Sequence, residues 1–150
     1  MGAKKSVLFV CIGNACRSQM AEGFARAYGS DVLEVASAGV APAFTIPFST
    51  VKVMEEKNIR LAGQFPKSLD GLGREEYDLI VNMSGYPFPA GPRGEVEEWE
   101  ILDPIGMDVD VYREVRDEIE NRVMRVILAA RGELRGNCEV PPADRRKFLR

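Results

Sequence analysis

Residues 7–10, Val-Leu-Phe-Val, form an unbroken apolar run near the N-terminus of this 150-residue chain, and they constrain its fold more than any other stretch. An apolar run without alternation is typical of a central parallel strand that is covered on both faces. Gly13 and Asn14 follow in a short loop, and both tolerate left-handed backbone conformations. The stretch therefore predicts a strand, a tight loop and a helix that begins at Ser18, with apolar residues at helical spacing at Met20, Phe24, Ala27 and Tyr28.

The loop between this strand and helix is expected to bind an anion. Successive backbone N–H groups can point into one concavity where the chain curls at Gly13 and Asn14. Ser18 is a good helix N-cap, and the positive end of the helix dipole then faces the same concavity. A phosphate-like dianion would be held by Ser18 and by the loop residues Ile12, Gly13, Asn14, Ala15 and Cys16.

Cys11 lies where the strand ends, and its thiol is the candidate nucleophile. The loop amides, the helix N-terminus and the guanidinium of Arg17 all favour a thiolate over a thiol. Arg17 can present a planar fork to two oxygens of a tetrahedral oxyanion, and Ser18 can donate its hydroxyl to the sulfur. The simpler interpretation is a buried free cysteine beside an arginine that pairs with a carboxylate. Because the Cys-x5-Arg-Ser pattern lies between a strand and a helix, we favour the catalytic interpretation.

Further strands are predicted at residues 32–37, 77–83 and 99–102, with short helices after Pro47 and Pro66. The Pro- and Gly-rich residues 86–94 predict an irregular loop. A long helix that ends at Gly132 is predicted from its apolar face, which comprises Tyr112, Val115, Ile119, Val123, Val126, Ile127 and Ala130. We therefore expect an α/β fold, a single doubly wound domain over residues 1–132 with a four-stranded parallel sheet flanked by helices on both faces. Residues 133–150 are expected to be a partly disordered tail.

The amino-acid composition excludes several classes of catalytic mechanism and of binding partner. The chain has no histidine, which excludes Ser-His-Asp and Cys-His mechanisms and argues against a metal site, so acid–base work falls to carboxylates. Its three cysteines, Cys11, Cys16 and Cys138, are too few for a disulfide framework. A net charge of −3 gives no nucleic-acid footprint, and the lack of a membrane-spanning run or signal peptide predicts a cytoplasmic protein that does not bind membranes. Nothing in the pattern calls for a metal or another cofactor.

Asp103 is the candidate general acid. It follows a predicted strand, and Pro104 stiffens the loop, so its carboxyl could reach over the Cys11 loop and protonate a leaving oxygen. Taken alone, an Asp-Pro pair more often marks only a turn.

The segment from Cys11 to Ser18 resembles the signature of the low-molecular-weight protein tyrosine phosphatases and of the structurally similar thioredoxin-coupled arsenate reductases. The resemblance extends over about residues 5 to 131. It implies that Asp103, in the Asp-Pro before the last long helix, is the acid. It also implies that Ser37, in a Ser-Ala-Gly at the end of the second strand, helps to hold the catalytic loop.

The first functional hypothesis is hydrolysis of phosphate monoesters, either protein phosphotyrosine or small aryl phosphates. Cys11 would attack phosphorus in line, Arg17 and the loop amides would stabilise the charge, and Asp103 would protonate the leaving group before the phosphocysteine is hydrolysed. The partners would be the oxyanion substrate and a phosphoprotein. A non-catalytic oxyanion-binding module is disfavoured, because nucleophile, arginine and acid are all present.

The alternative is arsenate reduction with the same cysteine loop. By resemblance, Gln19 after Arg17-Ser18 and Ile105 after Asp103-Pro104 are closer to the reductases than to the phosphatases. The thioredoxin-coupled reductases need two more cysteines after the third strand, and the segment that begins at Met83 has none. Reduction would therefore need a thiol-redox partner as an external donor. Cys16 could form a reversible disulfide with Cys11, and Cys138 is expected to be a free thiol.

Overall fold

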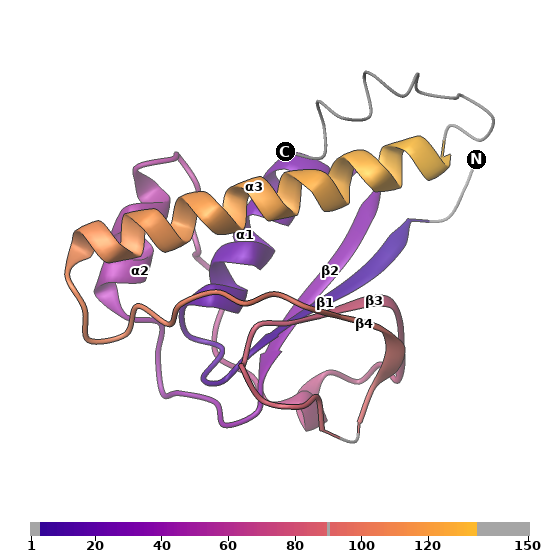
Figure 1. Cartoon of the computed structure of the whole chain (residues 1–150), viewed down its shortest axis with the longest axis horizontal. Coiled ribbons are helices and arrows are strands. Elements are labelled where there is room, and N and C mark those ends of the chain that lie inside the picture. The colour runs from indigo at the N-terminus through magenta and orange to yellow at the C-terminus, as the bar shows by residue number, and fades with distance from the viewer. Residues whose placement is uncertain (1–3, 90, 135–150) are drawn as a thin grey trace.

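The computed structural model describes residues 4–89 and 91–134, and their elements alternate between strand and helix over most of the chain (Figure 1). In chain order they are β1 (Lys5–Cys11), α1 (Arg17–Gly29), β2 (Leu33–Gly39), α2 (Phe48–Glu55), the 3-10 turn η1 (Leu69–Gly71), β3 (Glu76–Asn82), β4 (Arg93–Glu98) and α3 (Val109–Leu134).

The sheet has four strands in the order β2-β1-β3-β4, and every neighbouring pair is parallel. β1 is central, and the side chains of residues 7–10 are fully buried, as the unbroken apolar run predicts. The register pairs Cys11 with Gly39, so β1 and β2 end together beside the loop that follows β1. The predicted four-stranded parallel α/β fold is confirmed.

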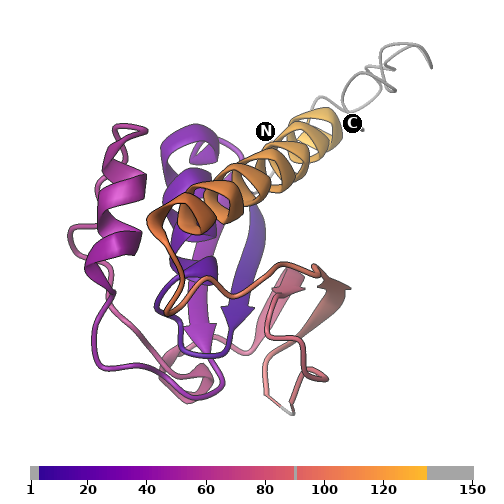
Figure 2. The same ribbon diagram turned by 60° about the vertical axis from the view of Figure 1, so that its left-hand side comes forward.

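The two faces of the sheet are covered unequally. Val7 and Phe9 of β1 belong to a large apolar cluster that includes residues of all three α-helices. Leu8 and Val10 face the other way into a small cluster, which the 3-10 turn covers through Leu69. Figure 2 shows α1, α2 and α3 together on one side of the strands. Among the described residues, the helical cover on the second face is the 3-10 turn η1.

The position of the fourth strand differs from the prediction. β4 covers Arg93–Glu98, where every residue is exposed, while the buried Trp99 and Ile101 lie in irregular chain. A polar edge strand carries no apolar signal, and the strand was predicted instead at residues 99–102, which include the apolar Trp99, Ile101 and Leu102. Gly94, predicted to lie in a loop, is a strand residue, and a Cβ there would lie 2.3 Å from the carbonyl oxygen of Tyr77.

The last helix, α3, continues through Gly132 to Leu134, so the predicted end at Gly132 is wrong by two residues. Residues 135–150, which include Cys138 and most of the predicted tail, lie outside the described residues. Within the described residues, no helix combines the length and the apolar character that crossing a membrane requires.

Candidate active site

The loop between β1 and α1 turns its carbonyl groups toward the segment after β2. The carbonyl oxygens of residues 11, 12 and 13 accept hydrogen bonds from the main-chain N–H groups of residues 40, 41 and 43, at 3.2, 2.9 and 2.8 Å. In a trans peptide the N–H points opposite to the C=O, so the N–H groups of Ile12, Gly13 and Asn14 point to the other side. Asn14 has a φ of 49°, the left-handed conformation that lets such a loop curl into a nest.

Gly39 at the end of β2 allows this loop to pack closely. A Cβ atom at Gly39 would lie 2.6 Å from the carbonyl oxygen of Ile12 and 2.7 Å from the main-chain nitrogen of Asn14. Backbone atoms cannot move aside as a flexible side chain can, so only glycine fits at this position. The end of β2 thereby fixes the shape of the loop between β1 and α1. We call residues 12–16 the anion loop, after the binding role expected from the sequence.

The thiol of Cys11 is buried, with 2% of the residue exposed, and its Sγ lies 2.9 Å from the hydroxyl oxygen of Ser18. This contact is the one expected of Ser18 as a donor to the sulfur. Ser18 is not the helix N-cap, however: Cys16 takes that position and caps with no side-chain hydrogen bond. Serine usually favours the N-cap position, where its hydroxyl binds a backbone N–H. Here the Ser18 hydroxyl contacts the Cys11 sulfur instead, so Ser18 does not mark the start of the helix.

Arg17 reaches across the site to two other segments. Its Nη1 donates to the carbonyl oxygen of Met83 and, at 3.1 Å, to that of Ile101, while its Nη2 lies 3.4 Å from Oδ2 of Asp103. Only 4% of Arg17 is exposed, so the guanidinium is held in a fixed position. Asp103, which is far from Cys11 and Arg17 in the sequence, is thus brought to the same end of the sheet as these two residues.

Asp103 lies at the open side of this group, with 40% of its side chain exposed. Its Oδ1 accepts a hydrogen bond from the main-chain N–H of Ile105 at 3.1 Å, and its Oδ2 faces Arg17. Asp103 therefore closes a turn with one oxygen and faces Arg17 with the other.

Cys16 is a buried free thiol at the end of the same loop. Burial raises the pKa of Cys16 to about 12, against a smaller lowering by the Thr50 side chain. At neutral pH this thiol is therefore almost entirely protonated and a poor nucleophile.

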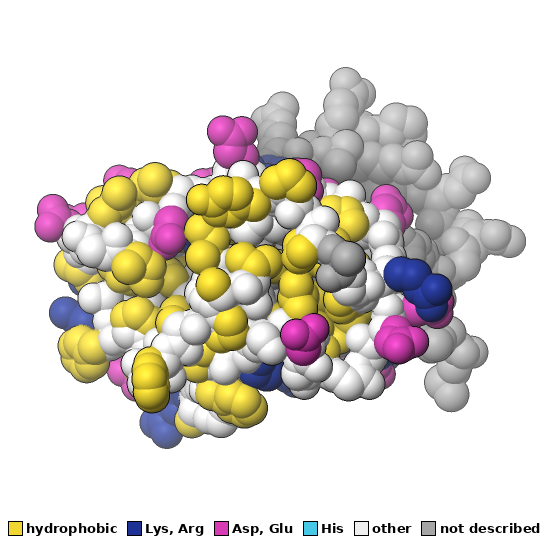
Figure 3. Space-filling view, turned by 90° about the horizontal axis from the view of Figure 1, so that it is seen from below, with side chains coloured by type: hydrophobic (Ala, Val, Ile, Leu, Met, Phe, Trp, Pro, Cys, Tyr) yellow, Lys and Arg dark blue, Asp and Glu magenta, His cyan; other side chains and the backbone are white. Residues whose placement is uncertain are grey.

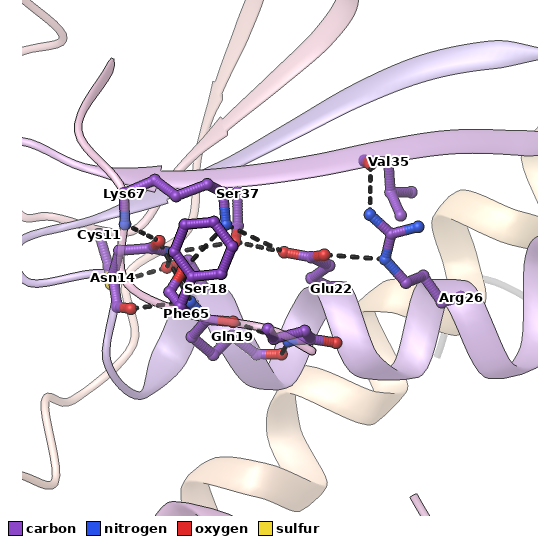
Figure 4. Close-up of polar contacts among 11 residues, drawn as sticks. Cys11, Asn14, Ser18, Gln19, Glu22, Arg26, Val35, Ser37, Phe65 and Lys67 are labelled. Carbon is purple, nitrogen blue, oxygen red and sulfur yellow. Dashed lines mark hydrogen bonds and ion pairs between the residues drawn. The ribbon is translucent and has the colours of Figure 1, made fainter. Parts of the chain in front are cut away.

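A second layer of polar side chains supports the loop from behind (Figure 4). The Asn14 amide donates to the hydroxyl of Ser37 at 3.0 Å, and that hydroxyl donates to the carboxylate of Glu22, which is 3% exposed. Ser37 thus lies between Asn14 of the loop and Glu22 of α1. The sequence did not predict three members of this layer: Glu22, Lys67, and Gln19 as a contact of Asn14. A charged residue on the buried side of α1 is a weak sequence signal for a role of Glu22, whereas no sequence signal indicates a role for Lys67.

The segments that follow β2 and precede α3 carry exposed apolar side chains. Figure 3 shows the face below that of Figure 1, with many hydrophobic side chains spread over it. Phe44 is fully exposed, which excludes a role in the core. The other large apolar side chains exposed in the segments after β2 and before α3 are Val40, Leu102, Ile105 and Met107.

Residues 6–87 match the family model described as low molecular weight phosphotyrosine protein phosphatase. The chain is 34% identical over 127 residues to the glutaredoxin arsenate reductase of Synechocystis, with 82% of this chain and 96% of that protein covered. An arsenate reductase solved in the phosphate binding state superposes with a TM-score of 0.74 at 32% identity, covering 84% of this chain and 98% of that one. The YwlE arginine phosphatase of Geobacillus stearothermophilus shares the fold, with a TM-score of 0.72 at 24% identity over 91% and 99% of the two chains.

Proposed function

The chain belongs to the low molecular weight phosphotyrosine protein phosphatase family, and on that premise we propose that it is an arsenate reductase that uses Cys11 as nucleophile and an external thiol as electron donor. The observation that carries the proposal is the Cys11 sulfur held 2.9 Å from Ser18 at the base of an anion loop, beside Arg17. Relatives more than 30% identical are named arsenate reductases, and this favours reduction over the ester hydrolysis that the sequence pattern placed first.

In the first step the Cys11 thiolate attacks arsenic, an S–As bond forms, and an As–O bond breaks. The N–H groups of residues 12–14 and the guanidinium of Arg17 stabilise the oxyanion charge. Asp103, on the open side, supplies the proton that lets the oxygen leave as water. Arg17 is fixed by Met83 and Ile101, so little reorganisation is needed as the charge develops.

In the second step an external thiolate attacks the Cys11 sulfur. A mixed disulfide forms, the S–As electron pair stays on arsenic, and arsenite leaves with arsenic reduced from the +5 to the +3 state. A second thiol then attacks the mixed disulfide, releases Cys11 and leaves an oxidised donor disulfide. The donor therefore supplies two thiols for each arsenate.

The donor is external because, within residues 4–89 and 91–134, Cys11 has no suitable second thiol. The segment 83–89 after β3 has no cysteine, and Ser84 instead closes a small polar turn with Asn82 and Tyr86. Cys16 is close along the chain, but its burial keeps it protonated.

A second candidate is hydrolysis of phosphate monoesters, with small aryl phosphates or a phosphoprotein as substrate. The observation that favours it is Asp103 facing the anion loop beside Arg17, where an acid could protonate an ester oxygen.

For either activity we propose a cytoplasmic location, because a free catalytic thiol persists in a reducing compartment.

The deciding experiment compares arsenate reduction, with glutathione and glutaredoxin, thioredoxin or dithiothreitol as donor, with hydrolysis of para-nitrophenyl phosphate by the same preparation. We expect reduction with at least one donor, and its loss in Cys11→Ser. Efficient ester hydrolysis with no reduction by any donor would replace the proposal with the second candidate.

A further inference from the structure

The orientation of the Asn14 side chain can be assigned from its partners. The main-chain N–H of Lys67 points at one terminal atom of the amide at 2.9 Å, and Nε2 of Gln19 lies 3.1 Å from the same atom. A main-chain N–H can only donate, so this atom is the oxygen Oδ1. The other terminal atom is therefore the donor Nδ2, which lies 2.7 Å from the Ser18 hydroxyl and 3.0 Å from the Ser37 hydroxyl.

This orientation fixes the direction of the hydrogen bonds that lead to Cys11. Asn14 donates to Ser18, so the Ser18 hydroxyl accepts there and its own hydrogen remains for the Cys11 sulfur 2.9 Å away. On the other branch, Asn14 donates to Ser37, and Ser37 donates its only hydroxyl hydrogen to the Glu22 carboxylate. The Ser18 branch favours a thiolate at Cys11, because its last donor points at the sulfur, whereas the Ser37 branch ends at the Glu22 carboxylate.

The arrangement also puts a buried negative charge behind the nucleophile. Glu22 projects from α1 with 5% of its side chain exposed, and two cations face its carboxylate. Arg26, one turn further along α1, donates from Nε to Oε2 at 2.8 Å, but 56% of its side chain is exposed. Lys67 places Nζ 4.0 Å from Oε1 with only 22% of its side chain exposed. Buried charges are screened less than exposed ones, so the Lys67 charge acts on Glu22 with less solvent screening than the closer Arg26 charge.

The Lys67 ammonium is held in place from several sides. It donates to the carbonyl oxygen of Phe65 at 3.0 Å and lies 5.0 Å from the centre of that ring (Figure 4). Burial lowers the pKa of Lys67, the Glu22 charge raises it, and Arg26 lowers it further. The ammonium is thus partly desolvated and directed at Glu22.

We propose that Lys67 is a positioning residue for Cys11: its main-chain N–H fixes the Asn14 amide, and its ammonium compensates the Glu22 charge at the far end of the same hydrogen-bond network. The inference rests on the proposed function only in taking Cys11 as the nucleophile. The charged groups that face the network are Arg26 and Lys67 at Glu22, and Arg17 and Asp103 at the anion loop. Loss of the Lys67 ammonium leaves Glu22 undercompensated, and a thiolate at Cys11 becomes less favourable.

The test is the pH dependence of Cys11 alkylation by iodoacetamide, followed by mass spectrometry of the Cys11 peptide so that Cys16 and Cys138 are counted separately. In Lys67→Met we expect the midpoint of the pH–rate profile to move up by about half a unit or more. Lys67→Arg, which keeps the charge, should retain the native midpoint. Lys52→Met, on the exposed side of α2, is the matched control and should also retain it.

The double variant Glu22→Gln with Lys67→Met separates charge from packing. Glutamine keeps an acceptor for Ser37 and removes the negative charge, so the midpoint should return toward the native value. An unchanged midpoint in Lys67→Met, or a double variant shifted as far as Lys67→Met alone, overturns the proposal. Circular dichroism of each variant verifies folding. Alkylation needs no arsenate, so failure of the proposed reductase activity is recognised separately.

Discussion

Arg17 donates a hydrogen bond to the carbonyl oxygen of Ile101, a residue 84 positions further along the chain. The bond joins the start of α1 to the segment that carries Asp103, and Nη2 of the same guanidinium lies 3.4 Å from the Asp103 carboxylate. Because Nη1 is taken up by two backbone carbonyls, the plane of the guanidinium is set before any substrate arrives. Arg17 thus shapes the site, and in the proposed mechanism it also binds the oxyanion.

Arg17→Lys should therefore lose activity although the charge is kept. A lysine ammonium cannot bridge Met83 and Ile101 and also offer a planar fork to an oxyanion. We expect kcat/KM to fall about 100-fold or more, in the range seen when one preorganised donor to a developing oxyanion is removed. Steady-state kinetics with arsenate and a saturating donor measure this. Retention of more than a tenth of the native value would show that the fork is not required.

Ser18→Ala should make Cys11 a weaker nucleophile while the other residues of the site stay in place. The substitution removes the donor 2.9 Å from the sulfur and leaves one Asn14 N–H without its acceptor. The midpoint pH for Cys11 alkylation should rise by about one unit. Ser30→Ala, just beyond the end of α1, is the control. A native profile in Ser18→Ala would mean that the loop amides and the helix N-terminus alone stabilise the thiolate.

Asp103→Asn should separate proton transfer from nucleophile activation. Asparagine keeps an oxygen for the N–H of Ile105 but cannot deliver a proton. We expect kcat to fall about 100-fold or more while the pH profile of Cys11 alkylation changes little. Rapid-quench measurement of arsenite release, with the alkylation assay in parallel, resolves the two effects. Equal loss in both assays would instead give Asp103 a structural role.

The sequence was sufficient for β1, the anion loop and α1, because apolar periodicity, Gly13 and Asn14 are local signals. It was insufficient for Glu22 and Lys67, since their contacts are tertiary. Glu22 meets Ser37 across 15 positions, and the N–H of Lys67 meets Asn14 across 53. Neither residue type carries a motif that predicts such a partner.

Two further differences have physical causes. Ser18 has the propensity of an N-cap, but the sulfur of Cys11 offers its hydroxyl a buried partner, and that tertiary contact decides its role. β4 is an exposed polar edge strand, so the apolar pattern that located β1 could not locate it.

The same contrast between local and tertiary pairing appears on α3, where Arg113 and Asp117 are four residues apart, a spacing at which helical side chains are neighbours. Arg113 instead binds Asp110 and, across the interface with α2, Glu56 at 2.8 Å. Arg116 also reaches Glu56, at 2.7 Å, from a largely buried position. The two arginines lower the pKa of Glu56 to about 2, mainly through the hydrogen bond from Arg113.

Stability should therefore depend on the charge of Glu56 in acid. Its pKa in the folded protein, about 2, lies below the value of 4.5 for an unperturbed carboxyl, so the contribution is fully present above pH 4.5 and is lost as the pH falls toward 2. Glu56→Gln should have a lower Tm than the native protein at pH 6, and the difference should shrink steadily between pH 4.5 and pH 2. Glu55→Gln, the adjacent exposed carboxylate, controls for the general effect of removing an acidic side chain. A Tm difference for Glu56→Gln that stays constant across this range would mean that the two arginines stabilise the α2–α3 contact through packing and not through the charge of Glu56.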